Sequence, residues 1–146
     1  MHPAKSWLLE QLGNKAAEAL RANGFDAVFV PNTEAARAAV LERMPKGASV
    51  GFGSSMTLQE IGIIPALEAG GFDLINPPNK KLPDDKTERD AIRRRAVQAD
   101  VFLASANAIT LDGEIASTDG TGNRLVSYLF GPRATILVAG VNKIVP

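Results

Sequence analysis

The sequence predicts an α/β fold with three layers, α/β/α, built on a mainly parallel sheet with one antiparallel hairpin. Strand-like and helix-like segments alternate along the chain, and two strand-like runs, VFLA and ATILVA, are continuously apolar. Strands of that kind are typically buried on both faces of a parallel sheet. The hairpin is predicted from Asp112-Gly113, because Asp-Gly supplies the positive φ values of a tight primed turn.

Periodic apolar residues define the elements expected in the first half of the chain. Leu8, Leu12, Ala16 and Leu20 recur every four residues, which predicts an amphipathic helix that ends near Asn23-Gly24. The elements expected after it are a buried strand over 26–30, a helix over 33–44, a strand over 49–52, a helix that begins at 54–57 and is interrupted at Gly62, and a strand over 72–75.

The second half continues the alternation. Residues 76–83 hold three prolines and two asparagines and are expected to form a loop. The elements expected beyond it are a helix from a cap at Asp84 or Asp85 to about Ala99, a strand over 101–104, the hairpin, a helix over 125–130 and a strand over 134–139. With 146 residues and no linker-like segment, the chain is expected to be a single domain over 1–146.

Composition and charge exclude several classes of protein. The formal net charge is zero, which gives no electrostatic reason to bind nucleic acid or an anionic membrane. The chain has no cysteine and one histidine, His2, so disulfides and iron–sulfur ligation within it are excluded, and we expect no metal site and no cofactor. No apolar run approaches the ~20 residues that span a bilayer, and the N-terminal residues lack the apolar stretch expected of a signal peptide. We therefore expect a cytoplasmic protein.

The first candidate site is the run GFGSSMT at 51–57, between an expected strand and an expected helix. Ligands of open α/β sheets sit outside the carboxyl ends of the strands, and the free N–H groups of a following helix suit an anion. The candidate ligand-binding residues are Gly53, Ser54, Ser55 and Thr57. The alternative is that these hydroxyls only cap the helix. Met56 replaces the third glycine of a dinucleotide fingerprint, and the lysine of a P-loop is missing.

The second candidate site is the run GTGNR at 120–124. Gly120 and Gly122 suggest close approach of a ligand or positive φ. Asn123 offers donors and an acceptor, and Arg124 offers a planar fork for a carboxylate or phosphate. Together with Thr121, these residues are predicted to bind a small anionic ligand. The alternative is a helix-entry turn whose arginine pairs with a nearby aspartate.

The candidates for acid–base chemistry are few. Asp119, beside the glycine loop, is the better candidate for a catalytic base or a partner of a ligand hydroxyl. Lys143, just past the last buried strand, is the second catalytic candidate, with a solvated terminal lysine as the alternative. Asp112 is expected to be a turn residue. The basic run Arg93-Arg94-Arg95 is expected to be a solvated helix face.

At these residues the sequence resembles the lactate-utilisation domain family, called LUD and formerly DUF162. The motifs that carry the resemblance are GFGSSMTLQEIG, NAITLDGEIASTDGTGNR and FGPRATILVAGVNKIV, and together they cover roughly residues 47–145. The family's fold is similar to that of ribose-5-phosphate isomerase, glucosamine-6-phosphate deaminase and CoA transferases. Some enzymes of that larger group carry an acidic residue before the hairpin where this chain has Asn107, another candidate ligand-binding residue. Family members usually continue past Asn-Lys-Ile-Val, whereas this chain stops at Pro146.

The resemblance implies a role in the oxidation or utilisation of L-lactate or a related organic acid. In that system one subunit carries the LUD domain alone and another joins it to an iron–sulfur module, so the expected partner is an iron–sulfur subunit. A homodimer is a further expectation, because α/β domains of this size are often dimers. The leading hypothesis is a non-redox, ligand-binding subunit.

Two other functions stay open at this point. The first is an autonomous isomerase or transferase acting on a phosphorylated or CoA-linked molecule. The second is a protein-interaction module without chemistry, for which the loops merely shape a surface. The residues alone do not decide whether the chain is an enzyme.

Overall fold

The computed structural model describes residues 2–146, which divide into two compact units. The first unit comprises the chain up to Asn32 together with Ala106–Thr118 and Ala139–Pro146, and the second comprises Thr33–Ser105 and Asp119–Val138. Each unit is therefore assembled from segments that are distant in the sequence. The single-domain organisation predicted for 1–146 stays a prediction.

The second unit is built on a parallel sheet, as predicted. Its strands are β1 (Ser49–Phe52), β2 (Asp73–Ile75), β3 (Val101–Ala104) and β6 (Ala134–Leu137), in the order β2-β1-β3-β6. All three pairings are parallel. The helices of this unit are α2 (Thr33–Glu42), α3 (Met56–Glu60), α4 (Ile63–Ala69), α5 (Lys86–Val97) and α6 (Asn123–Leu129). The break between α3 and α4 falls at Gly62, whose φ of 66° suits glycine.

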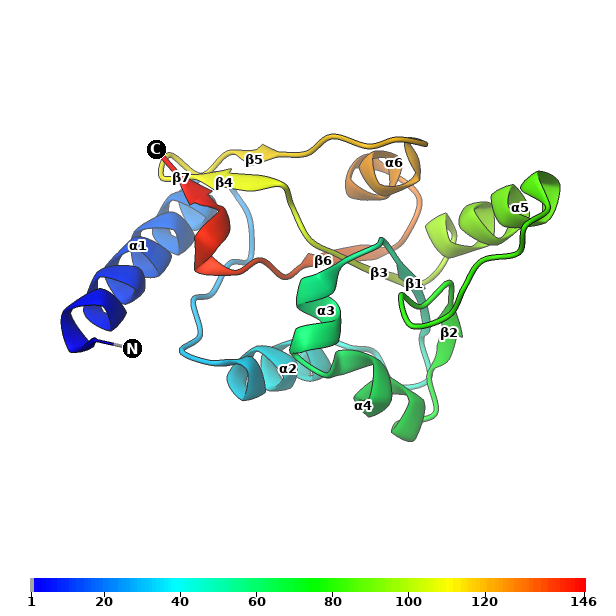
Figure 1. Ribbon diagram of the computed structural model, residues 1–146, viewed down its shortest axis with the longest axis horizontal. Coiled ribbons are helices and arrows are strands. Elements are labelled where there is room, and N and C mark those ends of the chain that lie inside the picture. Colours follow the sequence, from blue (N-terminus) through cyan, green and yellow to red (C-terminus); the bar gives the residue numbers. More distant parts are fainter. Residues whose placement is uncertain (1) are drawn as a thin grey trace. The chain divides into compact units, whose positions relative to one another are not determined.

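Alternation along the strands divides the core of this unit between the two faces of the sheet. Val50 and Phe52 of β1 belong to a cluster with the apolar residues of α2, α3 and α4. Phe102 and Ala104 of β3 face the opposite way, toward Ala96 of α5 and the region of α6. Figure 1 shows α2, α3 and α4 on one side of β1 and β3, with α6 on the other. The predicted three-layer α/β/α arrangement is therefore confirmed.

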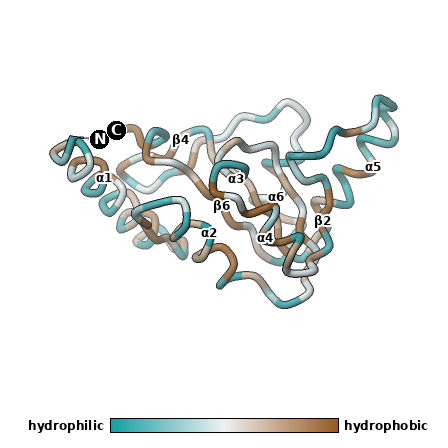
Figure 2. Tube along the Cα trace, turned by 60° about the horizontal axis from the view of Figure 1, so that its bottom comes forward, coloured by the Kyte–Doolittle hydropathy of each residue, from teal (hydrophilic) through white to brown (hydrophobic). Residues whose placement is uncertain are grey.

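The α5 helix packs very closely on β1 despite its charged sequence, which colours most of it teal in Figure 2. A Cβ built on Gly51 would lie 2.1 Å from the carbonyl oxygen of Ala96. Ala96 itself is fully buried. The contact requires a glycine in β1 and a small residue in α5.

The first unit pairs α1 (Pro3–Ala22) with a small mixed sheet. Its strands are β4 (Ala108–Thr110), β5 (Ile115–Ala116) and β7 (Ile144–Val145), in the order β5-β4-β7, and the 3-10 helix η1 (Val141–Lys143) precedes β7. The hairpin β4–β5 is antiparallel, as predicted. The α1 helix ends at a C-cap formed by Asn23, also as predicted.

The turn of this hairpin differs in type from the prediction. Among the non-glycine residues described, Asn76 is the one with positive φ, so Asp112 does not adopt the left-handed conformation of a primed turn. Instead, the Gly113 N–H donates to the Thr110 carbonyl, and Gly113 has a φ of 81°. This is the pattern of a three-residue loop in which a left-handed glycine follows an ordinary turn. Asn23 Nδ2 donates to the carbonyls of Asp112 and Gly113, each at 3.0 Å, which fixes the turn against α1.

The prediction of a strand over residues 26–30 is wrong. These residues join neither sheet, and Val28 is 53% exposed. The apolar run packs on α1 instead, since a Cβ built on Gly13 would lie 2.2 Å from the ring of Phe29. A short apolar run indicates burial of part of the segment, but strand pairing also requires a neighbouring edge with free hydrogen-bonding groups.

Over residues 2–146, no helix is both long enough and apolar enough to cross a membrane.

The contact between β1 and α5 gives a stability prediction. Gly51→Ala should lower the free energy of unfolding by about 3 kcal/mol, because the added methyl group collides with helix backbone that cannot rotate away. Gly120→Ala is the matched control, since a Cβ built there meets nothing within 4 Å. Chemical denaturation of the two variants measures the difference. A Gly51→Ala variant as stable as Gly120→Ala would contradict the packing described.

Candidate functional site

A cavity of about 300 Å³ lies in the second unit, at the carboxyl ends of β1 and β2. Ligands of parallel sheets bind at that edge because the loops that follow neighbouring strands converge there. The lining residues are Gly53, Ser54, Asn76, Leu82, Arg93, Asp119, Gly120, Thr121, Asn123 and Arg124. The two runs that the sequence singled out, at 51–57 and at 120–124, thus contribute to one site.

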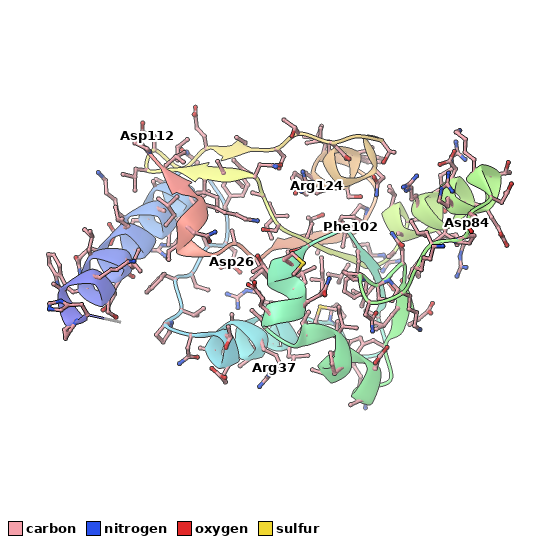
Figure 3. All side chains as sticks on the ribbon, in the orientation of Figure 1. Asp26, Arg37, Asp84, Phe102, Asp112 and Arg124 are labelled. Carbon is pink, nitrogen blue, oxygen red and sulfur yellow. The ribbon has the colours of Figure 1, made fainter. Side chains whose placement is uncertain are left out.

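Arg124 is held at this edge by contacts with the ends of β1 and β3. Its Nη1 donates to the carbonyl of Ser105 at 3.4 Å, and Tyr128 Oη donates to the same carbonyl at 2.7 Å. A Cβ built on Gly53 would lie 3.4 Å from Cδ of Arg124 and 3.2 Å from Cβ of Ala104. Figure 3 shows Arg124 on the side of α6 nearest β3. The arginine stem therefore lies beside Gly53, at the carboxyl end of β1.

Asp119 acts as the anchor of the loop at 120–124. Its Oδ2 accepts from the backbone N–H groups of Arg124 at 2.7 Å and Leu125 at 3.1 Å, and its Oδ1 accepts from that of Thr121 at 3.3 Å. Arg124 and Leu125 belong to the first turn of α6, where backbone N–H groups lack partners within the helix, and Thr121 lies in the loop just before it. The carboxylate satisfies them and fixes the path of the loop.

The same contacts set the charge state of Asp119. Burial on its own raises the pKa of the carboxyl, but the N–H groups of Leu125, Arg124 and Thr121, together with the positive charge of Arg124, outweigh it. The pKa of Asp119 therefore lies below its usual value. An ionised carboxylate of low pKa is a weak proton acceptor at neutral pH.

The loop contains one glycine that its backbone requires and one that it does not. Gly122 precedes α6 with a φ of 80°, which an L-residue rarely adopts. Gly120 has no positive φ, and a Cβ built on it meets nothing within 4 Å. Thr121 Oγ1 donates to Asn123 Oδ1, which orients the amide of Asn123 at the cavity. The predicted positive φ is therefore found at Gly122. Gly120 lacks it, and no atom of the described residues occupies the space where its side chain would be.

A comparison of the chain with protein families matches residues 13–146 to the LUD domain. The chain belongs to the LUD family. This confirms the family predicted from its motifs, and the family is linked to the utilisation of lactate. No significant match was found among the curated proteins or among the solved structures.

Other predicted residues of the LUD domain are not among those that line the cavity. Ser55 is buried, and its Oγ accepts from the N–H of Leu58 as the cap of α3, the alternative foreseen for the hydroxyls of this run. Thr57 lies within α3. Asn107 and Lys143 belong to the first compact unit. There, Asn107 Oδ1 accepts from the N–H of Thr118 at 3.1 Å, close to the base of the hairpin.

The sequence did not single out three residues that line the cavity. Asn76 follows β2 with a φ of 60°, and its Nδ2 lies 3.5 Å from the carbonyl oxygen of Phe52. Leu82 comes from the proline-rich loop at 76–83, whose Lys80 and Lys81 are exposed. The signal for Asn76 was available, because it follows the carboxyl end of a strand as Gly53 does, and because asparagine tolerates positive φ.

Arg93 is the third of these residues, and its expected placement on a solvated face is wrong. Its side chain is 26% exposed, whereas Arg94 and Arg95 are exposed, as predicted. Consecutive residues of a helix point about 100° apart, so a run of three cannot share one environment. Over residues 2–146, no group of three or more His, Cys, Asp or Glu side chains could hold a metal ion.

The anchoring role of Asp119 in the LUD domain gives a pH-dependence prediction. Because the folded-state pKa is depressed, ionised Asp119 stabilises the fold above the unfolded pKa of about 3.9, and this contribution is lost as pH falls through the folded pKa. Asp119→Asn should cost about 1 kcal/mol near pH 7, and the difference from wild type should shrink below about pH 4. Urea unfolding at several pH values measures it.

Asp84→Asn is the surface control for this experiment, because Asp84 is exposed and pairs only with exposed Lys81 among the described residues. It should change stability by less than about 0.5 kcal/mol. If the difference in free energy of unfolding between wild type and Asp119→Asn stayed constant from neutral to acidic pH, the stabilisation would not depend on the ionised form of Asp119, and the prediction would be wrong.

Proposed function

We propose that this LUD domain is a non-redox, ligand-binding subunit that acts in the utilisation of L-lactate or a related organic acid. The observation that carries the proposal is the convergence of Arg124, Asn123, Thr121 and Ser54 on one cavity at the carboxyl edge of a parallel sheet. An arginine fork suits a carboxylate, and the hydroxyl and amide groups suit a neighbouring hydroxyl.

The electrostatics of the cavity favour an anion. Two guanidinium groups, those of Arg93 and Arg124, line it with one carboxylate, that of Asp119. The negative charge of Asp119 is already stabilised by three backbone N–H groups. The lining therefore carries a net positive charge, and the ligand would supply the compensating negative charge.

The LUD domain would leave electron transfer to a partner. The chain has no cysteine and cannot itself bind an iron–sulfur cluster through thiolates. We assign the oxidation of an organic acid held here to an iron–sulfur partner subunit. The low pKa of Asp119 supports binding over acid–base catalysis by this residue. The presence of a concave cavity lined by these polar side chains supports ligand binding over a pure interaction module.

Removal of Arg124 tests the proposal. Arg124→Ala should weaken binding of L-lactate or glycolate by about 10-fold or more, because a charge-assisted hydrogen bond is worth about 1.5–3 kcal/mol. Arg94→Ala removes the same charge from an exposed position and should leave the affinity unchanged. Isothermal titration calorimetry measures both, with thermal melting as a check of folding. Equal affinities in wild type and Arg124→Ala would refute the assignment.

Gly120→Ala tests how closely the ligand approaches the loop. The fold has room for the added methyl group, so the melting temperature should stay within about 2 °C of wild type. If the ligand lies against the loop backbone, the methyl group should weaken its binding by about 10-fold. If Gly120→Ala bound the ligand with unchanged affinity, the ligand would not lie against the backbone of Gly120.

A further inference from the structure

We infer that the cavity accepts an organic acid with two separate anionic groups, one bound by Arg124 and the other by Arg93. The inference rests on the proposed function, in which Arg124 binds an anion, and extends it to the class of ligand. It comes from the placement of Arg93, a residue of α5 that neither the motifs nor the family match assigns to the site.

Arg93 is directed inward by the geometry of its helix. It precedes Ala96 by three residues, and residues three apart lie on the same face of a helix. Ala96 is fully buried against β1, so the same face brings the Arg93 stem toward the sheet edge. The Arg93 side chain is 26% exposed and lines the cavity together with Leu82. Partial burial of a guanidinium is costly unless it gains charged partners.

The partner that Arg93 has is a weak one. Its Nη1 lies 3.4 Å from Oδ1 of Asp90, longer than the 2.7–2.9 Å that is usual for a charge-assisted bond. Within the part of the chain that the structure describes, the other cation bound to Asp90 is Lys86, whose Nζ lies 3.1 Å from Oδ2. Asp90 would therefore keep a cationic partner if Arg93 turned toward a ligand.

The two arginines enter the cavity from different helices, α5 and α6, and hold different acceptors. Arg124 donates to the Ser105 carbonyl, while Arg93 donates to Asp90. The cavity volume of about 300 Å³ lies at the lower end of the range for small-molecule sites. Because both arginines line this one cavity, we assign one acidic group of a short organic acid to each of them, with Leu82 and Ser54 in the same lining.

The test compares two ligands that share one end. L-Malate has the 2-hydroxycarboxylate of L-lactate and a second carboxylate. At pH 7 and fixed ionic strength, calorimetry should find L-malate bound by wild type about 10-fold more tightly than L-lactate. Arg93→Ala should reduce this preference to less than about 3-fold, because L-malate should lose more affinity than L-lactate when the second guanidinium is removed.

Three further variants make the outcomes separable. Arg94→Ala should behave as wild type, since the side chain is exposed on the same helix. Arg93→Gln keeps most of the side-chain volume and should lose the preference as Arg93→Ala does, which guards against a folding defect. Arg124→Ala should weaken the binding of both ligands.

Each result counts for or against the inference. If L-lactate binds as tightly as L-malate in wild type and depends on Arg124, the two-anion class is wrong while the proposed function stands. Equal losses for both ligands in Arg93→Ala would also overturn it, because Arg93 would then act only through its general charge. If both ligands bind but neither depends on Arg124, the proposed function fails. If neither ligand binds, both proposals fail.

Discussion

The close contact between β1 and the layer formed by α5 and α6 is the constraint on which the rest of the second unit depends. Gly51 and Gly53 are two residues apart in an extended strand and its continuation, so they face the same side of the sheet. At Gly51 the missing side chain admits the backbone of α5 at Ala96, and at Gly53 it admits the stem of Arg124. Gly51 excludes a larger residue for steric reasons, whereas a Cβ at Gly53 would be in tight contact with the side chains of Ala104 and Arg124.

This pair of glycines also connects the fold to the site. Seating α5 on Gly51 fixes the rotation of that helix about its axis, and Arg93 lies one turn before the contact. The opening at Gly53 fixes where Arg124 reaches the sheet edge. Phe52, between the two glycines, points the other way into the core with α2, α3 and α4. One strand thus packs against α2, α3 and α4 on one face and, on the other, against α5 and the stem of a residue that lines the cavity.

Much of this could be predicted from the sequence, because the strongest signals were local. The strand at 49–52 coincides with β1, and the break at Gly62 falls where positive φ is required. The run GTGNR was predicted to form a site because a turn alone does not require Asn123 or Arg124, and residues of this run line the cavity. The sequence signal was weaker where partners distant in the chain decide the outcome. Residues 26–30 read as a strand, but Phe29 packs on Gly13 of α1.

The misjudged arginine run shows why side-chain environment is harder to predict than secondary structure. Composition treats Arg93, Arg94 and Arg95 alike, whereas the helix turns each by about 100° from the last. Only the burial of Ala96 indicates that Arg93, and not Arg94 or Arg95, faces the sheet. The burial of Ala96 depends in turn on its contact with Gly51, which lies 45 residues earlier in the sequence. Tertiary contact therefore assigns the residue to the cavity, and sequence periodicity alone does not.

The role of Asp119 could not be predicted from the sequence, because an aspartate at such a position can act either as a catalytic base or as a helix cap. A carboxylate beside a glycine loop has the composition of a catalytic base and also that of a helix anchor. Geometry distinguishes them, because three backbone N–H groups converge on its oxygens and hold it ionised. The hydrogen bonds that stabilise this negative charge also order the loop before a ligand binds. A loop ordered in advance loses less conformational freedom when a ligand binds, and this favours affinity.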